Sequence, residues 1–303
     1  MSKYKTLGAA LLVMLLWGSL FPMVKVGYAA YGIVTVGDIL LFAGVRFTLC
    51  GAIVCLFAFF KDKSSYRPMA NVWLPVLMSG LISIALHYAF SYLGLLWTEA
   101  SKTAILKQVA SLLYISFSFL FFKNEKPTVK KLLAALLGFA GILLINTNGQ
   151  GIQFQLGDVL ILAASVCIVV ANVISKKVFD RVSPITATGV SQLFGGVILL
   201  VVGVAMGGQM HFDFAKIYVM LYICAASIVS YCLWYTVVKD GELSKLFIIK
   251  FAEPVFACLF GAWIFGENIL RWQYLVAFAL ICAGICLASV TKKKPEQTDA
   301  KNA

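Results

Sequence analysis

Basic side chains inside apolar stretches are the first candidates for chemistry in this 303-residue sequence. Lys107 and Lys250 each lie close to the middle of an apolar segment. A charge in the hydrocarbon core of a bilayer costs at least ~2.5 kcal/mol on insertion scales, so each should face a cavity or a partner. We predict that the two ammonium groups clamp an anionic ligand group. Neutralisation of local carboxylates, or snorkelling to an interface, is the alternative.

Three further charged residues lie inside apolar segments. Glu253 follows Lys250 by three residues, so the two side chains can pair on one helix face. Three roles stay open for Glu253: an internal ion pair, a proton-coupling or amine-binding carboxylate, or part of a Glu-Pro pair in which Pro254 bends the helix. We expect Arg46 to bond neighbouring carbonyls in the outer half of its helix, and we group it with Glu253 as a coupling or ion-pair residue. Lys25 is expected to snorkel to the membrane interface.

Aromatic, imidazole and amide side chains on other segments could line the same cavity. A histidine can shuttle protons near neutral pH, although a hydrogen-bonded packing role is equally consistent with the sequence. Tyrosines spaced by four residues form aromatic walls with hydroxyls that suit a small organic ligand, and interhelical packing is the alternative. The predicted lining comprises His87, Tyr88, Tyr92, Tyr231, Tyr235, Trp17, Gln108 and Asn172.

The composition decides which elements must position these residues. Hydrophobic residues make up 61% of the chain and charged residues 13%, against roughly 25% charged in soluble domains. This balance excludes a soluble domain, a disordered chain and a secreted disulfide scaffold. About 20 apolar residues span a bilayer as a helix. Such runs predict an all-α membrane protein with ten transmembrane helices over 6–27, 36–60, 72–96, 100–122, 128–147, 156–176, 185–207, 217–238, 244–265 and 271–291.

The two halves of the chain repeat each other. Segment 98–107 aligns with segment 241–250, and the same offset relates the two tyrosine pairs. We therefore predict two five-helix repeats, 1–148 and 152–291, followed by a disordered cytoplasmic tail at 292–303. Because five is odd, the second repeat enters the membrane inverted. Inverted repeats are the architecture of secondary transporters, whose ligand site lies at the repeat interface.

The distribution of basic residues predicts the orientation. With a cytoplasmic N-terminus, the outer loops carry only Lys102, Lys216 and Arg271, whereas the inner loops and tails carry most other lysines and arginines. The positive-inside rule then places both termini in the cytoplasm of a multi-pass protein of the cell (inner or plasma) membrane. The net charge of +12 does not indicate nucleic-acid binding, because the basic residues form no contiguous face.

Several short motifs occur in a fixed order along the chain. They are Leu16-Trp17-Gly18-Ser19, Val45-Arg46-Phe47, Phe122-Lys123-Asn124-Glu125, Ser183-Pro184, Glu253-Pro254, Phe265-Gly266-Glu267 and Ala283-Gly284-Ile285. Together they resemble EamA-type members of the drug/metabolite transporter superfamily over essentially the whole chain. The resemblance implies a ten-helix inverted-repeat fold, a central cavity, alternating access and no ATP-binding domain. It leaves the substrate open, because one fold hosts many functions.

The basic pair is also similar to that of the triose-phosphate and sugar-phosphate translocators in the same superfamily. In those proteins, basic residues on helices 4 and 9 hold the phosphate. By that resemblance Lys107 and Lys250 would be the phosphate or carboxylate ligands, and His87 would be an auxiliary donor. Here Phe251 replaces a second basic residue, and Glu253 lies one turn further on. Both departures favour a monoanion or a zwitterion.

The sequence therefore predicts a secondary transporter of a small anionic or zwitterionic metabolite, which is proton-coupled or works by exchange. Candidate substrates are an organic acid, an amino acid or a phosphorylated small molecule. The alternative is an exporter of cationic or aromatic drugs that uses Glu253, although central lysines would repel such ligands. An enzyme is not indicated, because HExxH and GxSxG motifs are absent. We expect no cofactor or metal, and we expect the substrate and membrane lipids as partners of a monomer or homodimer.

Overall fold

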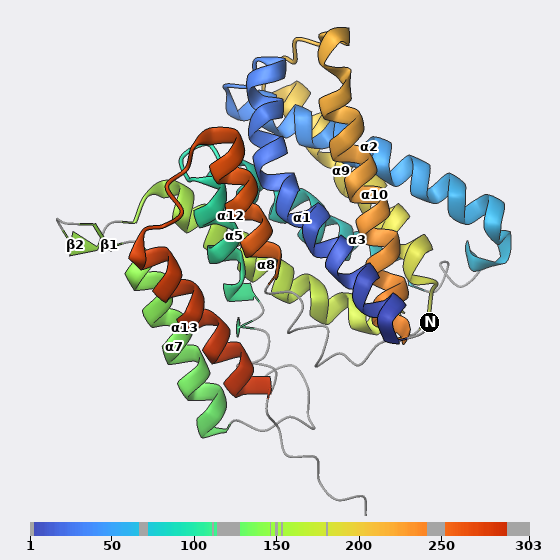
Figure 1. Cartoon of the computed structure of the whole chain (residues 1–303). Coiled ribbons are helices and arrows are strands. Elements are labelled where there is room, and N and C mark those ends of the chain that lie inside the picture. The colour runs from blue at the N-terminus through green and yellow to red at the C-terminus, as the bar shows by residue number, and fades with distance from the viewer. Residues whose placement is uncertain are drawn as a thin grey trace, which may run out of the picture.

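The computed structural model of the chain is a bundle of apolar helices (Figure 1). It describes residues 3–66, 72–110, 112–113, 128–145, 147–148, 151–152, 154–179, 181–240 and 252–289. The predicted ligand residue Lys250 and the predicted tail 292–303 lie outside these residues.

Five helices form the first half of the chain, and the third of them changes its winding. Residues 73–94 run as one continuous helix with a π-helical centre, where α3 passes through η2 into α4. The elements are α1 (Lys3–Tyr31), α2 (Val36–Lys61), α3 (Trp73–Gly80), η2 (Leu81–Leu86), α4 (His87–Gly94), α5 (Ala100–Lys107) and α7 (Val129–Ile145). Because π-helical turns are rare and concentrate at functional sites, the winding change directly before His87 is notable.

A short hairpin and five helices form the second half. The hairpin pairs Thr147 with Ile152 and forms the one β-sheet among the described residues. The elements are β1 (Thr147–Asn148), β2 (Gly151–Ile152), α8 (Leu156–Phe179), α9 (Pro184–Ala205), the 3-10 turn η3 (Phe214–Lys216), α10 (Ile217–Asp240), α12 (Ala252–Phe265) and α13 (Trp272–Ser289).

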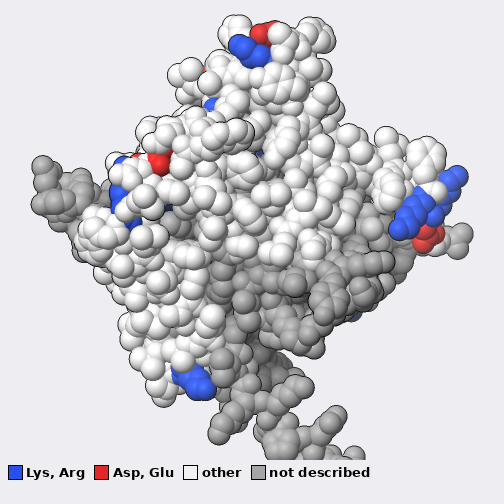
Figure 2. Space-filling view, in the orientation of Figure 1, with Lys and Arg blue, Asp and Glu red and all other residues white. Residues whose placement is uncertain are grey.

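Length and hydropathy make these helices suitable for a bilayer. Within the described residues, five helical stretches are long and apolar enough to span it: Gly8–Tyr31, Val36–Lys61, Trp73–Gly94, Ile185–Ala205 and Phe214–Trp234. Shorter apolar helices cover Leu156–Ala171, Ala252–Phe265 and Trp272–Gly284. Figure 2 shows that the charged residues on one face lie in small groups toward its margins, whereas the broad central surface carries other residues. The predicted all-α membrane fold is confirmed.

Helix packing follows the predicted duplication. Three helices pack on their own equivalents: α2 on α9, α5 on α12, and α7 on α13. Two further sets of contacts match, since α1 packs on α10 and α12 just as α8 packs on α4 and α5. Exchange of the two halves leaves this pattern unchanged, as a pseudo-two-fold axis in the membrane plane requires. The helices form two inverted five-helix repeats.

Two helix starts show how the sequence fixes these elements. Thr35 and Asp38 form a capping box at the start of α2, in which each side chain accepts a hydrogen bond from the other's backbone N–H. The Asp38 carboxylate also accepts from the Gln209 N–H at 2.7 Å, which ties α2 to the loop after α9. Ser183 is the N-cap of α9 and Pro184 is its first residue, where proline costs no hydrogen bond.

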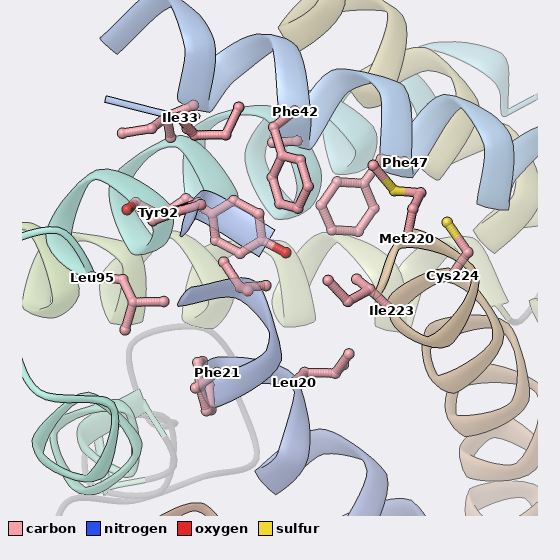
Figure 3. Packing of buried hydrophobic residues seen from close by; sticks show 14 of the residues in the cluster. Leu20, Phe21, Ile33, Phe42, Phe47, Tyr92, Leu95, Met220, Ile223 and Cys224 are labelled. Atoms are coloured by element: carbon pink, nitrogen blue, oxygen red, sulfur yellow. Dashed lines mark hydrogen bonds between the residues drawn. The ribbon is translucent and has the colours of Figure 1, made fainter. Parts of the chain in front are cut away.

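The main apolar core joins helices from both repeats. Figure 3 shows side chains from α1, α2, α4 and α10 that meet in one cluster. Its members Phe42, Phe47, Tyr92 and Ile223 are buried. The core therefore holds α2 and α4 of the first repeat against α10 of the second, and the polar residues described next lie beside it.

Candidate functional site

Two tyrosines meet where the repeats face each other. The hydroxyl oxygens of Tyr88, on α4, and Tyr231, on α10, are 2.9 Å apart. These residues are 143 positions apart, which is the offset between the repeats, so equivalent residues touch near the pseudo-two-fold axis. Trp17 of α1 packs edge-on against Tyr231 at 5.9 Å between ring centroids and also contacts Trp234. Aromatic rings with hydroxyls thus occupy the centre of the molecule.

Lys107 reaches this centre from the end of α5. Its Nζ lies 3.4 Å from Nε2 of His87 and 4.7 Å from the ring centroid of Phe21. The Nδ1 of His87 lies 2.8 Å from the carbonyl oxygen of Ala164 on α8. Because a carbonyl only accepts hydrogen bonds, we assign the proton of a neutral imidazole to Nδ1. The lone pair on Nε2 then accepts from the ammonium and orients it.

Arg46 reaches the same tyrosine from α2. Its side chain is 1% exposed, and its Nη2 donates to the hydroxyl of Ser227 on α10 at 2.5 Å. The Ser227 hydroxyl donates its own hydrogen bond to the carbonyl oxygen of Ile223 at 2.7 Å, so the Ser227 oxygen accepts from the guanidinium. The guanidinium carbon lies 4.6 Å from the ring centroid of Phe47 and 5.8 Å from that of Tyr88.

Two positive charges therefore share one aromatic ring. The guanidinium carbon of Arg46 and the Nζ of Lys107 each lie 5.8 Å from the ring centroid of Tyr88. Cation–π contact offsets part of the cost of burying a cation, but like charges so close in a low-dielectric interior repel each other. The arrangement favours a negative group among these side chains.

Glu253 lies in the first turn of α12 and is buried. The backbone of α1 packs directly on this turn, since a Cβ added at Gly18 would lie 2.8 Å from the Glu253 carbonyl oxygen. Gly18 directly follows Trp17, which packs against Tyr231. This acidic group is therefore close to the aromatic centre.

The other predicted lining residues lie on α4, α8 and α10 and directly after α5. Tyr92 lies one turn after Tyr88, and its ring centroid is 5.7 Å from the Arg46 guanidinium. Gln108 is buried directly after Lys107. Asn172 belongs to α8 and Tyr235 to α10, but their side chains lie outside the described part of the structure.

Three contact residues were not predicted. Phe21 and Phe47 present ring faces to the two cations, and Ser227 accepts from Arg46. A hydroxyl within an apolar segment was the only available signal for Ser227. Among the described residues, no cluster of three His, Cys, Asp or Glu side chains could hold a metal ion.

Comparison with known proteins assigns this arrangement to a family. The EamA-like transporter family matches residues 5–147 and 155–290. The chain belongs to the EamA-like transporter family. It is a multi-pass membrane transporter and not an enzyme, and the resemblance seen in the sequence motifs is confirmed.

Relatives of this EamA-like transporter include proteins of Bacillus subtilis and Escherichia coli. The "Uncharacterized transporter YvbV" of Bacillus subtilis is 28% identical over 98% of this chain and 95% of its own length. The "Uncharacterized inner membrane transporter YedA" of Escherichia coli is 22% identical over 94% of this chain and 90% of its own length. A solved crystal structure superimposes with a TM-score of 0.67 at 20% identity, covering 95% of this chain and 97% of that one. That likeness shows the fold alone.

Proposed function

We propose that this transporter moves a small anionic or zwitterionic metabolite by alternating access, with Lys107 binding the negative group. The substrate class is an organic acid, an amino acid or a phosphorylated small molecule. One observation carries the proposal: cations from α2 and α5 meet around Tyr88, where the two repeats face each other. Ligand sites of inverted-repeat transporters lie at this interface.

Two features support an anion over a cation. The His87 imidazole accepts from Lys107 as a neutral group, so it directs the ammonium and adds no positive charge of its own. A cationic ligand would be the third positive group near Tyr88. Lys250 remains the proposed second ammonium by its equivalence to Lys107 in the repeat alignment.

The remaining parts of the proposal concern organisation and coupling. We assign the repeats to residues 1–148 and 152–291 and a cytoplasmic tail to 292–303. Both termini then lie in the cytoplasm, and the working unit in the cell membrane is a monomer or homodimer. Glu253 carries a coupling proton or, in an exchanger, balances the charge of the site.

A drug exporter is the second candidate function. Its supporting observation is a buried carboxylate, Glu253, near an aromatic group formed by Trp17, Tyr231 and Trp234. Such a group would suit a cationic aromatic ligand. The two functions predict opposite ligand charge and are separated by one screen.

The test is a thermal-shift screen of the purified protein with organic acids, amino acids, sugar phosphates and cationic aromatic dyes. A ligand that binds the folded state stabilises it by RT ln(1 + [L]/Kd). Lys107→Ala should weaken binding of the anion found by roughly ten- to a hundredfold, since hydrogen bonds to charged groups contribute about 1.5–3 kcal/mol. Lys107→Arg should restore part of it.

The matched control is Lys102→Ala on the same helix. Lys102 pairs with Asp158 at 2.8 Å, away from Tyr88, so its loss should leave anion affinity unchanged. Stabilisation by cationic dyes alone, or an anion affinity that Lys107→Ala does not alter, would reject the proposal and leave the drug exporter.

A further inference from the structure

Arg46 is a buried charge that its surroundings do not neutralise. The side chain is 1% exposed, and in the described part of the chain none of its atoms lies within ion-pair distance of a carboxylate. Among the described residues, its hydrogen-bond partner is a neutral hydroxyl, that of Ser227. A buried guanidinium without a counter-charge is strongly unfavourable, so buried arginines are found paired.

Two hydrogen-bonding groups at this place lack partners. Nε of Arg46 and the hydroxyl of Tyr92 are buried and have no hydrogen-bond partner among the described residues. The Tyr92 ring centroid lies 5.7 Å from the guanidinium carbon, so both groups belong to one neighbourhood. Each can donate a hydrogen bond. Unsatisfied buried donors are rare in native proteins and require an explanation.

An oxyanion matches these donor groups in charge and in hydrogen bonding. A guanidinium presents its N–H groups as a planar fork that matches the two oxygens of a carboxylate, and a phenol hydroxyl adds a further donor. Resting on the proposed function, we infer that Arg46 binds a carboxylate of the substrate while Lys107 holds a second negative group of the same molecule. The substrate class is then a short dianion, in place of the monoanion or zwitterion that the sequence favours, and a dicarboxylate is its simplest form.

The geometry suits a short molecule. Both cations lie 5.8 Å from the Tyr88 ring centroid, so their separation cannot exceed the sum of these two distances. A few methylene groups between two carboxylates cover such a span. The Tyr88 ring then lies beside the body of the ligand, and the hydroxyl pair with Tyr231 places the second repeat next to it.

The experiment compares diacids with their monomethyl esters on the purified full-length protein. The probes are malonate, succinate, glutarate and adipate, each with its monoester, measured by thermal shift and by tryptophan fluorescence. We expect at least one diacid to bind roughly tenfold or more tightly than its monoester, because the ester loses one charged contact. Arg46→Gln should remove this preference for the diacid.

Two control variants separate a ligand contact from a structural role. Ser227→Ala removes the Arg46 bond to α10 but keeps the guanidinium itself, so it should lose less of the diacid preference than Arg46→Gln does. Arg46→Lys keeps the charge without the fork and should retain only part of the diacid affinity. It also serves as the test if Arg46→Gln fails to fold, as judged by its unfolding without ligand.

The outcomes distinguish this inference from the proposed function. Equal affinity for every diacid and its monoester, or no binding of any diacid, rejects the dianion as substrate. Lys107-dependent binding of a monoanion would then leave the proposed function intact. If Ser227→Ala loses as much of the diacid preference as Arg46→Gln does, Arg46 has a structural role and the inference is also rejected. Failure of all anions to bind rejects the proposed function itself.

Discussion

Glu267, in the loop after α12, holds Ser101 at the start of α5. Its Oε2 accepts from the backbone N–H of Ser101 at 3.0 Å and from the hydroxyl of Ser101 at 2.5 Å, and its Oε1 accepts from the N–H of Ala100 at 2.9 Å. Free N–H groups and the positive dipole end make a helix N-terminus a favourable site for a carboxylate. A residue of the second repeat thus caps the helix of the first repeat that ends in Lys107.

A second contact joins the same two regions. Arg271, just before α13, forms an ion pair of 3.1 Å with Glu99, the residue before α5. The hydroxyl of Tyr274 donates to the same carboxylate. The N-terminal end of α5 is therefore held twice by the loop between α12 and α13, and a movement of α5 would have to break both contacts.

We predict that Glu267→Gln loosens this end of α5. An amide replaces one acceptor oxygen with an NH2 group that faces N–H donors, so unfolding should require roughly 1–3 kcal/mol less. Cys258 packs against the apolar cluster that contains Ile105 and Leu106 of α5, so it should become more reactive toward a maleimide when it is the only cysteine present. Lys216→Gln is the control, because its exposed pair with Asp213 should contribute at most about 1 kcal/mol. Unchanged labelling and stability would contradict the prediction.

The hydroxyl pair of Tyr88 and Tyr231 should behave as a unit. Tyr88→Phe alone leaves the partner hydroxyl without its 2.9 Å bond, which should cost about 1–3 kcal/mol of stability. Tyr231→Phe should cost a similar amount. The double variant should lose clearly less than the sum of the two, because the bond between the two hydroxyls can be lost only once. A double-mutant cycle on chemical unfolding measures this coupling, and strict additivity would show that the bond contributes nothing.

Much of this arrangement could be predicted from sequence because it depends on local or repeated patterns. Apolar run lengths predicted the helices, and the repeat offset predicted that Tyr88 and Tyr231 are equivalent. Contacts made by residues far apart in the chain could not be predicted. Arg46 was expected to bond nearby carbonyls, yet it donates to Ser227, which is 181 residues away. The Phe21 ring beside Lys107 likewise depends on how α1 packs, which no local spacing encodes.

Close packing of α2 on α9 should make Gly44 intolerant of a side chain. A Cβ at this position would lie 2.3 Å from the backbone nitrogen of Leu200 and 2.5 Å from its Cα, so the two helices would have to separate. We expect Gly44→Ala to destabilise the protein by about 1–3 kcal/mol, as overpacking does. Gly8→Ala in α1 is the matched control, because a Cβ there meets no atom within 4 Å. Equal thermal stability of both variants would refute the close approach.

Ser64 and Ala215 should lie on opposite sides of the membrane. Both are exposed residues beside helix ends, Ser64 after α2 and Ala215 before α10. With both termini inside, as the positive-inside rule requires, Ala215→Cys should react with an impermeant maleimide on whole cells that express a cysteine-less background. Ser64→Cys should react only after permeabilisation. The reverse pattern would overturn the orientation while leaving the fold unaffected.

Glu253→Gln should separate coupling from binding. The amide fills the same buried place at the start of α12 but cannot take up or release a proton. If Glu253 carries the coupling proton, reconstituted Glu253→Gln should lose pH-driven accumulation of the anion found in the thermal-shift screen and keep exchange of that anion across the bilayer. Asp213→Asn, at a half-exposed carboxylate, should change neither activity. Loss of binding and exchange together in a folded variant would assign Glu253 to the ligand site. Undiminished accumulation would exclude it as the proton carrier, because no titrating group would then remain at that position.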